Sequence, residues 1–215
     1  MQLKLNQIAL VVMVAIAGYM AWQLQQSIYE NKGRLVAELD PSSRDTVIFS
    51  WNSEIDVPME QRFIEAFDKW QYRVNRVIID LHSPGGSLTE GRKVINVINR
   101  MKSTHRVDTR VGSHHSCLSM CVPIYLQGQT RYAAANSKWM FHEPRSYDVF
   151  TGEEVKGPIN EQRDLSQRFF AKYFTNSEMD PAWRTQLEQE WRGRDVWRTG
   201  SQLVAEGSNI IHQLN

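Results

Sequence analysis

The sequence predicts an α/β fold, and three neighbouring stretches carry that prediction. A β-rich run at 46–51 is followed at 59–70 by apolar residues at helical spacing. A continuous apolar run at 77–81 comes next, which is typical of a parallel strand that is covered on both faces. Strand, helix and strand in this order form a βαβ unit, so a largely parallel sheet with covering helices is expected.

Length and composition limit the classes of function. A chain of 215 residues with 41% hydrophobic residues suits one domain with a full core. Its 25 Lys and Arg against 24 Asp and Glu leave a net charge of +1, and no basic block occurs. A nucleic-acid partner is therefore not expected.

The N-terminal segment, residues 1–25, reads as a signal anchor or transmembrane helix. An apolar run at 8–22 follows a short polar start that carries Lys4, and it ends in Tyr19 and Trp22. Aromatic residues suit the membrane interface, which favours an uncleaved anchor. Cleavage as a signal peptide after Ala17 is the alternative, and a buried core helix is a weaker third reading. Either favoured reading places the rest of the chain outside the cytoplasm, at the membrane or secreted to the periplasm.

Residues 26–45 are polar and are expected to form a linker, which leaves 46–215 as the domain. Beyond the first βαβ unit the alternation of strand and helix continues. Helices are expected at 88–102, 160–173 and 182–191, strands at 107–111, 128–135 and 139–142, and an irregular or β excursion at 146–155.

The stretch 113–126 runs from a loop into an apolar helix. Inside that helix the ring of Pro123 would clash with the carbonyl of residue 119, so the helix is expected to begin at about Met120. Ser119 then lies at or beside the N-cap, where capping the helix is the commoner role of a serine.

Two other stretches favour a catalytic role for Ser119. The strand at 77–81 breaks at Ser83-Pro84-Gly85-Gly86, and such a turn leaves backbone N–H groups free to point at an anion. The strand at 139–142 ends in His142, a residue that titrates near neutral pH.

Taken together, these stretches resemble the proteolytic subunit of Clp proteases. The family pattern is Ser-Pro-Gly-Gly-Ser-x-x-x-Gly, then Ser-Met at a helix start, then Met-x-His-x-Pro. A fourth match, at 193–207, is an Arg-Asp pair followed by a helix that leads to glycine. The resemblance covers about 46–211 and implies the Clp–crotonase spiral of stacked βα units. It also implies a homo-oligomer, since the helix at 160–173 corresponds to the one that packs subunits or rings together.

The resemblance, together with the chemistry, assigns a triad. A serine hydroxyl needs a base to take its proton, and the base needs a group that holds one tautomer. Ser119 is the expected nucleophile, His142 the general base and Asp195 the orienting acid. Only the Arg-Asp match singles out Asp195 among the carboxylates that follow His142. The others are Asp148, Asp164 and Asp180.

The oxyanion hole is expected from the backbone N–H groups of Gly85, Gly86 and Met120, assisted by the positive end of the helix. An ordinary tight turn is the alternative for the glycines. The stretch lacks Gly-x-Ser-x-Gly, which argues against an α/β-hydrolase elbow.

The two cysteines, Cys117 and Cys121, bracket the nucleophile, where the family pattern usually has small residues. A disulfide and two buried free thiols are both open. A metal site with His114 and His115 fits no standard zinc spacing, and no metal or other cofactor is expected. A thiol nucleophile in place of Ser119 is a further, weaker alternative.

The sequence thus predicts a membrane-anchored, extracytoplasmic serine peptidase that cleaves peptides or unfolded proteins through an acyl-enzyme. No phosphate-binding loop is present. The N-terminal helix also stands where Clp-like subunits carry the loops that meet their unfoldase, which argues against an ATPase partner. The alternative is an inactive scaffold or binding protein of the Clp–crotonase fold. An acyl-CoA enzyme is less favoured, because a site outside the cytoplasm would lack CoA thioesters.

Overall fold

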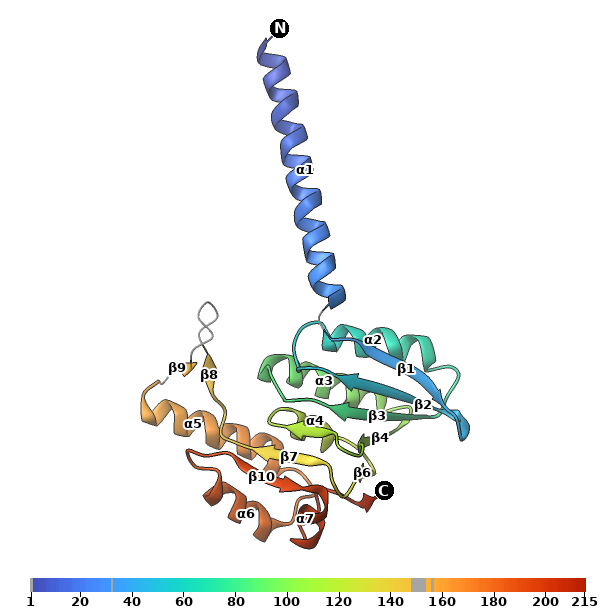
Figure 1. The fold of residues 1–215 in the computed structure, drawn as a ribbon, viewed down its shortest axis with the longest axis vertical. Coiled ribbons are helices and arrows are strands. Elements are labelled where there is room, and N and C mark those ends of the chain that lie inside the picture. Colours follow the sequence, from blue (N-terminus) through green and yellow to red (C-terminus); the bar gives the residue numbers. More distant parts are fainter. Residues whose placement is uncertain (1, 32, 148–153, 156) are drawn as a thin grey trace.

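The computed structural model describes residues 2–31, 33–147, 154–155 and 157–215 and shows an α/β fold (Figure 1). The helices are α1 (Gln2–Asn31), α2 (Met59–Trp70), α3 (Leu88–Met101), α4 (Cys121–Tyr125), α5 (Ile159–Phe170), the π-helical turn η1 (Ala171–Thr175), α6 (Pro181–Glu190) and α7 (Gly200–Ala205). The strands are β1 (Leu35–Asp40), β2 (Ser43–Asn52), β3 (Arg76–His82), β4 (Arg106–Val111), β5 (Ser116–Leu118), β6 (Arg131–Ala133), β7 (Lys138–Phe141), β8 (Ser146–Tyr147), β9 (Glu154–Val155), β10 (Val196–Thr199) and β11 (Gln213–Leu214).

The strands form a six-stranded sheet in the order β1-β2-β3-β4-β6-β11, a three-stranded sheet β10-β7-β5 and a short β8-β9 ribbon. From β2 to β11 the large sheet is parallel, and β1 adds to it as an antiparallel edge. The expected βαβ unit is therefore present, and its helix α2 has the predicted bounds.

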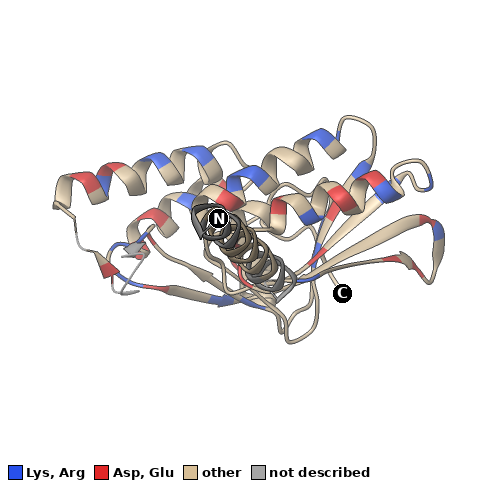
Figure 2. Ribbon diagram, turned by 90° about the horizontal axis from the view of Figure 1, so that it is seen from above, with Lys and Arg blue, Asp and Glu red and all other residues tan. Residues whose placement is uncertain are grey.

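Helices α2 and α3 lie along one face of the large sheet (Figure 2). Helix α2 buries Met59 and Phe63, and α3 is capped by Ser87, whose hydroxyl accepts a hydrogen bond from the N–H of Glu90. Blue segments for Lys and Arg and red segments for Asp and Glu are interspersed along the helices in Figure 2. This mixture of signs agrees with the small net charge.

A second part of the core is aromatic and joins α5, η1 and α6. Phe169, Phe170 and Phe174 meet Trp191, with ring centroids between 5.0 and 6.3 Å from that indole. The aromatic stripe on the predicted helix 160–173 is therefore largely buried within this chain. Burial of this kind contributes about 1.5–3 kcal/mol per large side chain.

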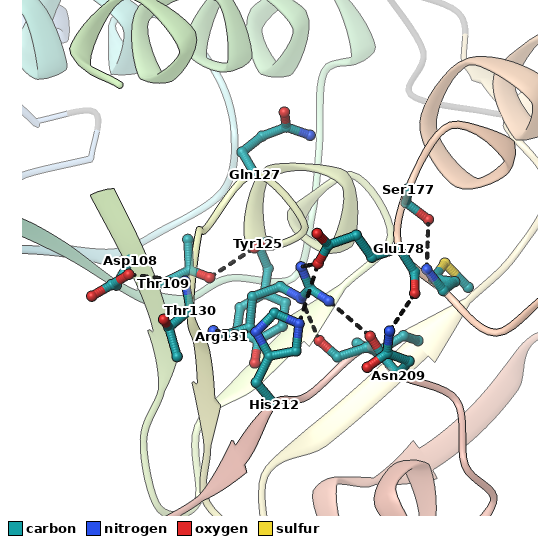
Figure 3. Close-up of polar contacts among 12 residues, drawn as sticks. Asp108, Thr109, Tyr125, Gln127, Thr130, Arg131, Ser177, Glu178, Asn209 and His212 are labelled. Atoms are coloured by element: carbon teal, nitrogen blue, oxygen red, sulfur yellow. Dashed lines mark hydrogen bonds and ion pairs between the residues drawn. The ribbon is translucent and has the colours of Figure 1, made fainter. Parts of the chain in front are cut away.

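The C-terminal segment is held by one buried arginine, Arg131 at the start of β6 (Figure 3). Its guanidinium donates to the carbonyls of Asn209 and Ile210 and to the carboxylate of Glu178. Only 2% of the Arg131 side chain is exposed. A buried cation needs such partners because isolated burial is costly, so these bonds fix the last residues against the sheet.

The predicted linker over 26–45 was wrong, because part of it belongs to the fold. Helix α1 continues to Asn31, and β1 pairs with β2 over most of its length. The strand was missed because its exposed edge position leaves polar residues between apolar ones. The excursion expected at 146–155 includes β8 and β9, while 148–153 lie outside the described residues.

Helix α1 projects away from the domain in Figure 1 and exposes large apolar side chains between Leu10 and Trp22. Over the described residues, no helical segment combines the length and the apolar character of a membrane crossing, so the span expected within 1–25 was not found.

Candidate active site

The three-stranded sheet brings the predicted triad residues to one edge. Strands β5 and β7 run parallel, so the residues that follow them, Ser119 and His142, leave the sheet at the same edge. Strand β10 is antiparallel to β7 and pairs Val196 with Phe141, so Asp195 enters the sheet opposite His142. Residues from three distant parts of the chain therefore converge through strand register alone.

Ser119 occupies a turn between β5 and α4. Its φ of 52° lies in the left-handed region, which is uncommon for a residue with a side chain and costs about 1–3 kcal/mol. Its N–H donates to the carbonyl of Met140 on β7 at 2.9 Å, and its carbonyl accepts from Val122 in α4. Met120 is the residue at the N-cap. As the position of Pro123 predicts, α4 begins directly after this turn.

His142 and Ser119 are hydrogen-bonded, with 2.7 Å between Nε2 and Oγ. Burial lowers the pKa of His142 below its ordinary value, and the nearby guanidinium of Arg145 lowers it further, against a smaller raising effect of Asp195. The imidazole is therefore neutral at neutral pH, which is the form that can take a proton from a serine.

Asp195 does not hydrogen-bond to His142. Its Oδ1 accepts from the guanidinium of Arg145 at 2.5 Å, and about a third of each side chain is exposed. The buried Nδ1 of His142 has no hydrogen-bond partner among the described residues. Of the alternative acids, Asp164 pairs with Arg168 and Asp180 caps α6, whereas 148 lies outside the described residues.

The glycine turn lies directly against the nucleophile. A Cβ on Gly85 would come within 2.6 Å of the Ser119 Cβ, and the φ of 95° at Gly85 also favours glycine. The N–H of Gly85 donates to Ser83 Oγ. Among the hydrogen bonds between described residues, none is donated by the N–H groups of Gly86 or Met120. These two donors, with Gly85 holding the close approach, are available to an oxyanion.

Cys117 and Cys121 form a disulfide that spans the nucleophile turn. Both cysteines are fully buried, and neither is a free thiol, so the thiol nucleophile and the free-thiol alternatives are overturned. The described residues contain no group of three or more side chains that could hold a metal ion. His114 instead faces Asn136, and His115 stacks on His82.

A cavity of about 740 Å³ is lined by residues that adjoin His142 and Asp195 in the chain, although neither of these two side chains lines it. Its wall combines residues that flank these two groups with the outer face of α5. Among them are Pro144, Arg145, Gln162, Trp191 and Arg194. The cavity carries both charges and apolar surface, which is a lining that suits a peptide side chain.

No sequence pattern indicated Arg145 as a partner of Asp195, because fifty residues separate the two. The role of His82, whose ring nitrogen accepts a backbone hydrogen bond beside the glycine turn, was also missed. Its position directly before Ser83-Pro84-Gly85-Gly86 was the available sign.

Comparison with known proteins agrees with this geometry. Residues 45–207, more than half of the chain, match the family model described as Clp protease. A comparison with curated proteins gave no match. Among solved structures, a point mutant of ClpP1 from Listeria monocytogenes is similar, with a TM-score of 0.58 and 17% identity over 80% of this chain and 91% of that one. That likeness shows an α/β fold of the same type, and the match to the family model shows that the chain belongs to the Clp protease family.

Proposed function

We propose that the protein is a serine peptidase that hydrolyses peptide bonds through an acyl-enzyme on Ser119. The observation that carries this proposal is the 2.7 Å hydrogen bond between Ser119 Oγ and a neutral His142. A serine hydroxyl bonded to an imidazole of lowered pKa is the arrangement in which the base removes the proton as the oxygen attacks.

The reaction follows from the positions of these groups. His142 takes the proton of Ser119 as Oγ attacks the peptide carbonyl, and the N–H groups of Gly86 and Met120 receive the negative charge that forms on its oxygen. His142 then gives the proton to the leaving amine. Water attacks the acyl-enzyme with His142 again as base, which releases the second product and restores Ser119.

The acid side of the triad is incomplete in a single chain, because Arg145 engages Asp195. The register that pairs Val196 with Phe141 nevertheless brings Asp195 opposite His142, which supports a role for Asp195 once Arg145 releases it. We include a homo-oligomer in the proposal, since a neighbouring copy or a bound peptide in the adjoining cavity would change what surrounds this exposed ion pair.

Two observations support a place outside the cytoplasm. The only two cysteines of the chain are joined, and disulfides persist mainly in oxidising compartments. The large apolar side chains that α1 exposes form a surface of the kind that a membrane covers, and this supports attachment of the helix to a membrane. Alkylation without reductant of protein from its native compartment should find no free thiol, whereas labelling of both cysteines would remove this support.

An inactive scaffold of the same fold is the second candidate. The observation that favours it is the ion pair between Asp195 and Arg145, which leaves the His142 Nδ1 without a partner among the described residues.

Reaction of the full chain in detergent with a fluorophosphonate probe separates the two candidates. The peptidase predicts a single adduct on Ser119 by intact mass, absent in Ser119→Ala and in His142→Ala. Ser201→Ala is a matched control, because Ser201 is an exposed serine of α7, and it should be labelled like wild type. No adduct on wild type, under reducing and oxidising conditions alike, would favour the scaffold.

A further inference from the structure

His82 ends β3 at the point where this strand changes its neighbour. Up to Asp80, β3 pairs with β4, and directly after His82 a single bridge joins Ser83 to Cys117 at β5. The strand therefore leaves the large sheet and contacts the small one here. This is the junction between the sheet that builds the core and the sheet that carries the nucleophile.

The side chain of His82 closes this junction. Its Nδ1 accepts a hydrogen bond from the backbone N–H of Ser116 at 2.9 Å, and the Ser116 hydroxyl lies 3.2 Å from the same nitrogen. The main chain adds two bonds, from Ser83 N–H to the Ser116 carbonyl and from Leu118 N–H to the Ser83 carbonyl. Ser116 is the first residue of β5, and its N–H is not used by the two main-chain bonds of the bridge. The ring of His82 supplies the acceptor for this N–H.

The two segments joined in this way carry opposite halves of the reaction. After His82 the chain passes through Ser83 to Gly85, which lies against Ser119, and to Gly86, whose N–H is one of the proposed oxyanion donors. After Ser116 it passes through β5 to Ser119. The distance between the attacking oxygen and the donors of the glycine turn therefore depends on how β3 and β5 are held together.

The ring of His82 is itself fixed. It stacks on His115 with 4.7 Å between ring centroids and 19° between planes. Stacked aromatic rings attract one another beyond the area that they bury. Stacking sets the plane of the ring, and the plane directs Nδ1 at the Ser116 N–H.

We propose that His82 is a positioning residue of the peptidase site. Through its bond to Ser116 it holds the glycine turn and β5 in the relative position that the reaction of Ser119 needs. The inference rests on the proposed function, because the relative position of the glycine turn and β5 affects a rate only if Ser119 reacts. His82 touches neither Ser119 nor the substrate in this role. It acts on the rate of acylation and leaves the binding cavity beside His142 unchanged.

The test compares variants that separate the acceptor from the ring. His82→Asn places an oxygen near the position of Nδ1 and removes the stack. His82→Phe keeps a ring and removes the acceptor, and His82→Gln carries an acceptor one bond farther out. His105→Phe is the matched control, since His105 also hydrogen-bonds through its ring and packs edge-on against Phe67, away from the site.

The readouts are the maximal rate and the half-saturating concentration of fluorophosphonate labelling, with amide hydrogen exchange of a peptide covering 113–118. We expect the maximal rate to fall about tenfold in His82→Phe and His82→Gln, with unchanged half-saturation and faster exchange. His82→Asn should stay within about threefold of wild type, and His105→Phe should equal it.

Equal labelling rates in wild type, His82→Phe and His82→Gln would overturn the inference, as would a loss in His82→Asn as large as in His82→Phe. A wild type that is not labelled at all would overturn the proposed function instead. Hydrogen exchange would then still report whether His82 ties Ser116. If His82→Phe does not fold, His82→Gln against His82→Asn gives the same comparison.

Discussion

The two sides of His142 are built in different ways. On its Ser119 side, the groups are fixed by backbone hydrogen bonds, a buried disulfide and the close approach of Gly85. On its Asp195 side, the contacts are made by exposed side chains, and the bond to Asp195 comes from Arg145 rather than from the imidazole. The first side is determined by the fold of one chain, whereas the second depends on what surrounds the protein.

This difference indicates which parts of the site a single chain can complete. Exposed ion pairs are worth about 0.2–1 kcal/mol, so the Arg145–Asp195 pair can be exchanged for another arrangement at little cost. Buried main-chain bonds cannot be exchanged without opening the core. Nucleophile and base should therefore act as a unit in every state of the protein, and the acid should respond to its surroundings.

The largest effect is expected from His142→Ala. Loss of the base should lower the labelling rate of Ser119 by at least about 10⁴, since single removals within such sites cost that much or more. The measurement is the rate of adduct formation by intact mass at pH 8. A fall of less than tenfold in the labelling rate would contradict the fixed Ser119–His142 unit, because Ser119 would then react without its base.

The next effect is expected from Gly85→Ala. The new Cβ would meet the Cβ of Ser119 at 2.6 Å and the carbonyl of Leu118 at 2.7 Å, so the turn must move away from the nucleophile. The labelling rate should fall by about 10²–10³, the usual cost of a lost oxyanion donor. Gly207→Ala is the control, because its φ is also positive and nothing lies within 4 Å of its Cβ. It should lower the thermal midpoint and leave labelling unchanged.

A smaller effect is expected from removal of the disulfide. In Cys117→Ala/Cys121→Ala the turn around Ser119 loses its cross-link, and we expect about a tenfold loss of labelling rate from poorer alignment. The closed loop is short, so the loss of unfolding free energy should be no more than about 2 kcal/mol. Reductant should slow labelling of the denatured and refolded wild type and have no effect on the double variant. Equal labelling rates in wild type and in the double variant would show that the backbone alone fixes the turn.

The smallest effect is expected on the acid side. Arg145→Gln frees Asp195, so the labelling rate at pH 8 should rise, by no more than about fivefold. It also removes a cation that lowers the pKa of His142. In wild type the acid limb of the rate profile should therefore lie below the ordinary histidine value of about 6.5, and in Arg145→Gln it should move to higher pH. A loss of rate as large as that of His142→Ala would contradict the proposed difference between the two sides.

The core elements could be predicted because their patterns follow from burial. Helix α2 has the predicted bounds, and its apolar residues include the buried Met59 and Phe63. The nucleophile turn could be placed because Pro123 limits where α4 begins. Strand β1 could not be predicted in the same way, because at the sheet edge three of its six residues are exposed.

The contacts of the site were less predictable than its members. The convergence of Ser119 and His142 follows from two strand ends, and the family resemblance indicated both. The partner of Asp195 depends on the reach of a long side chain from residue 145, which no local pattern encodes. The pairing of the cysteines was left open because spacing alone fits a bridge and two free thiols equally well.

The buried Arg131 has a consequence for the order in which the chain can fold. Its guanidinium is satisfied by the carbonyls of Asn209 and Ile210, which follow it in the chain by 78 and 79 residues. Chains fold from the N-terminus as synthesis proceeds, so Arg131 cannot be buried with these partners before residues 209–210 have left the ribosome. The β6 edge of the large sheet is therefore completed later in synthesis than the βαβ unit of β2, α2 and β3, whose strands are paired within residues 43–82.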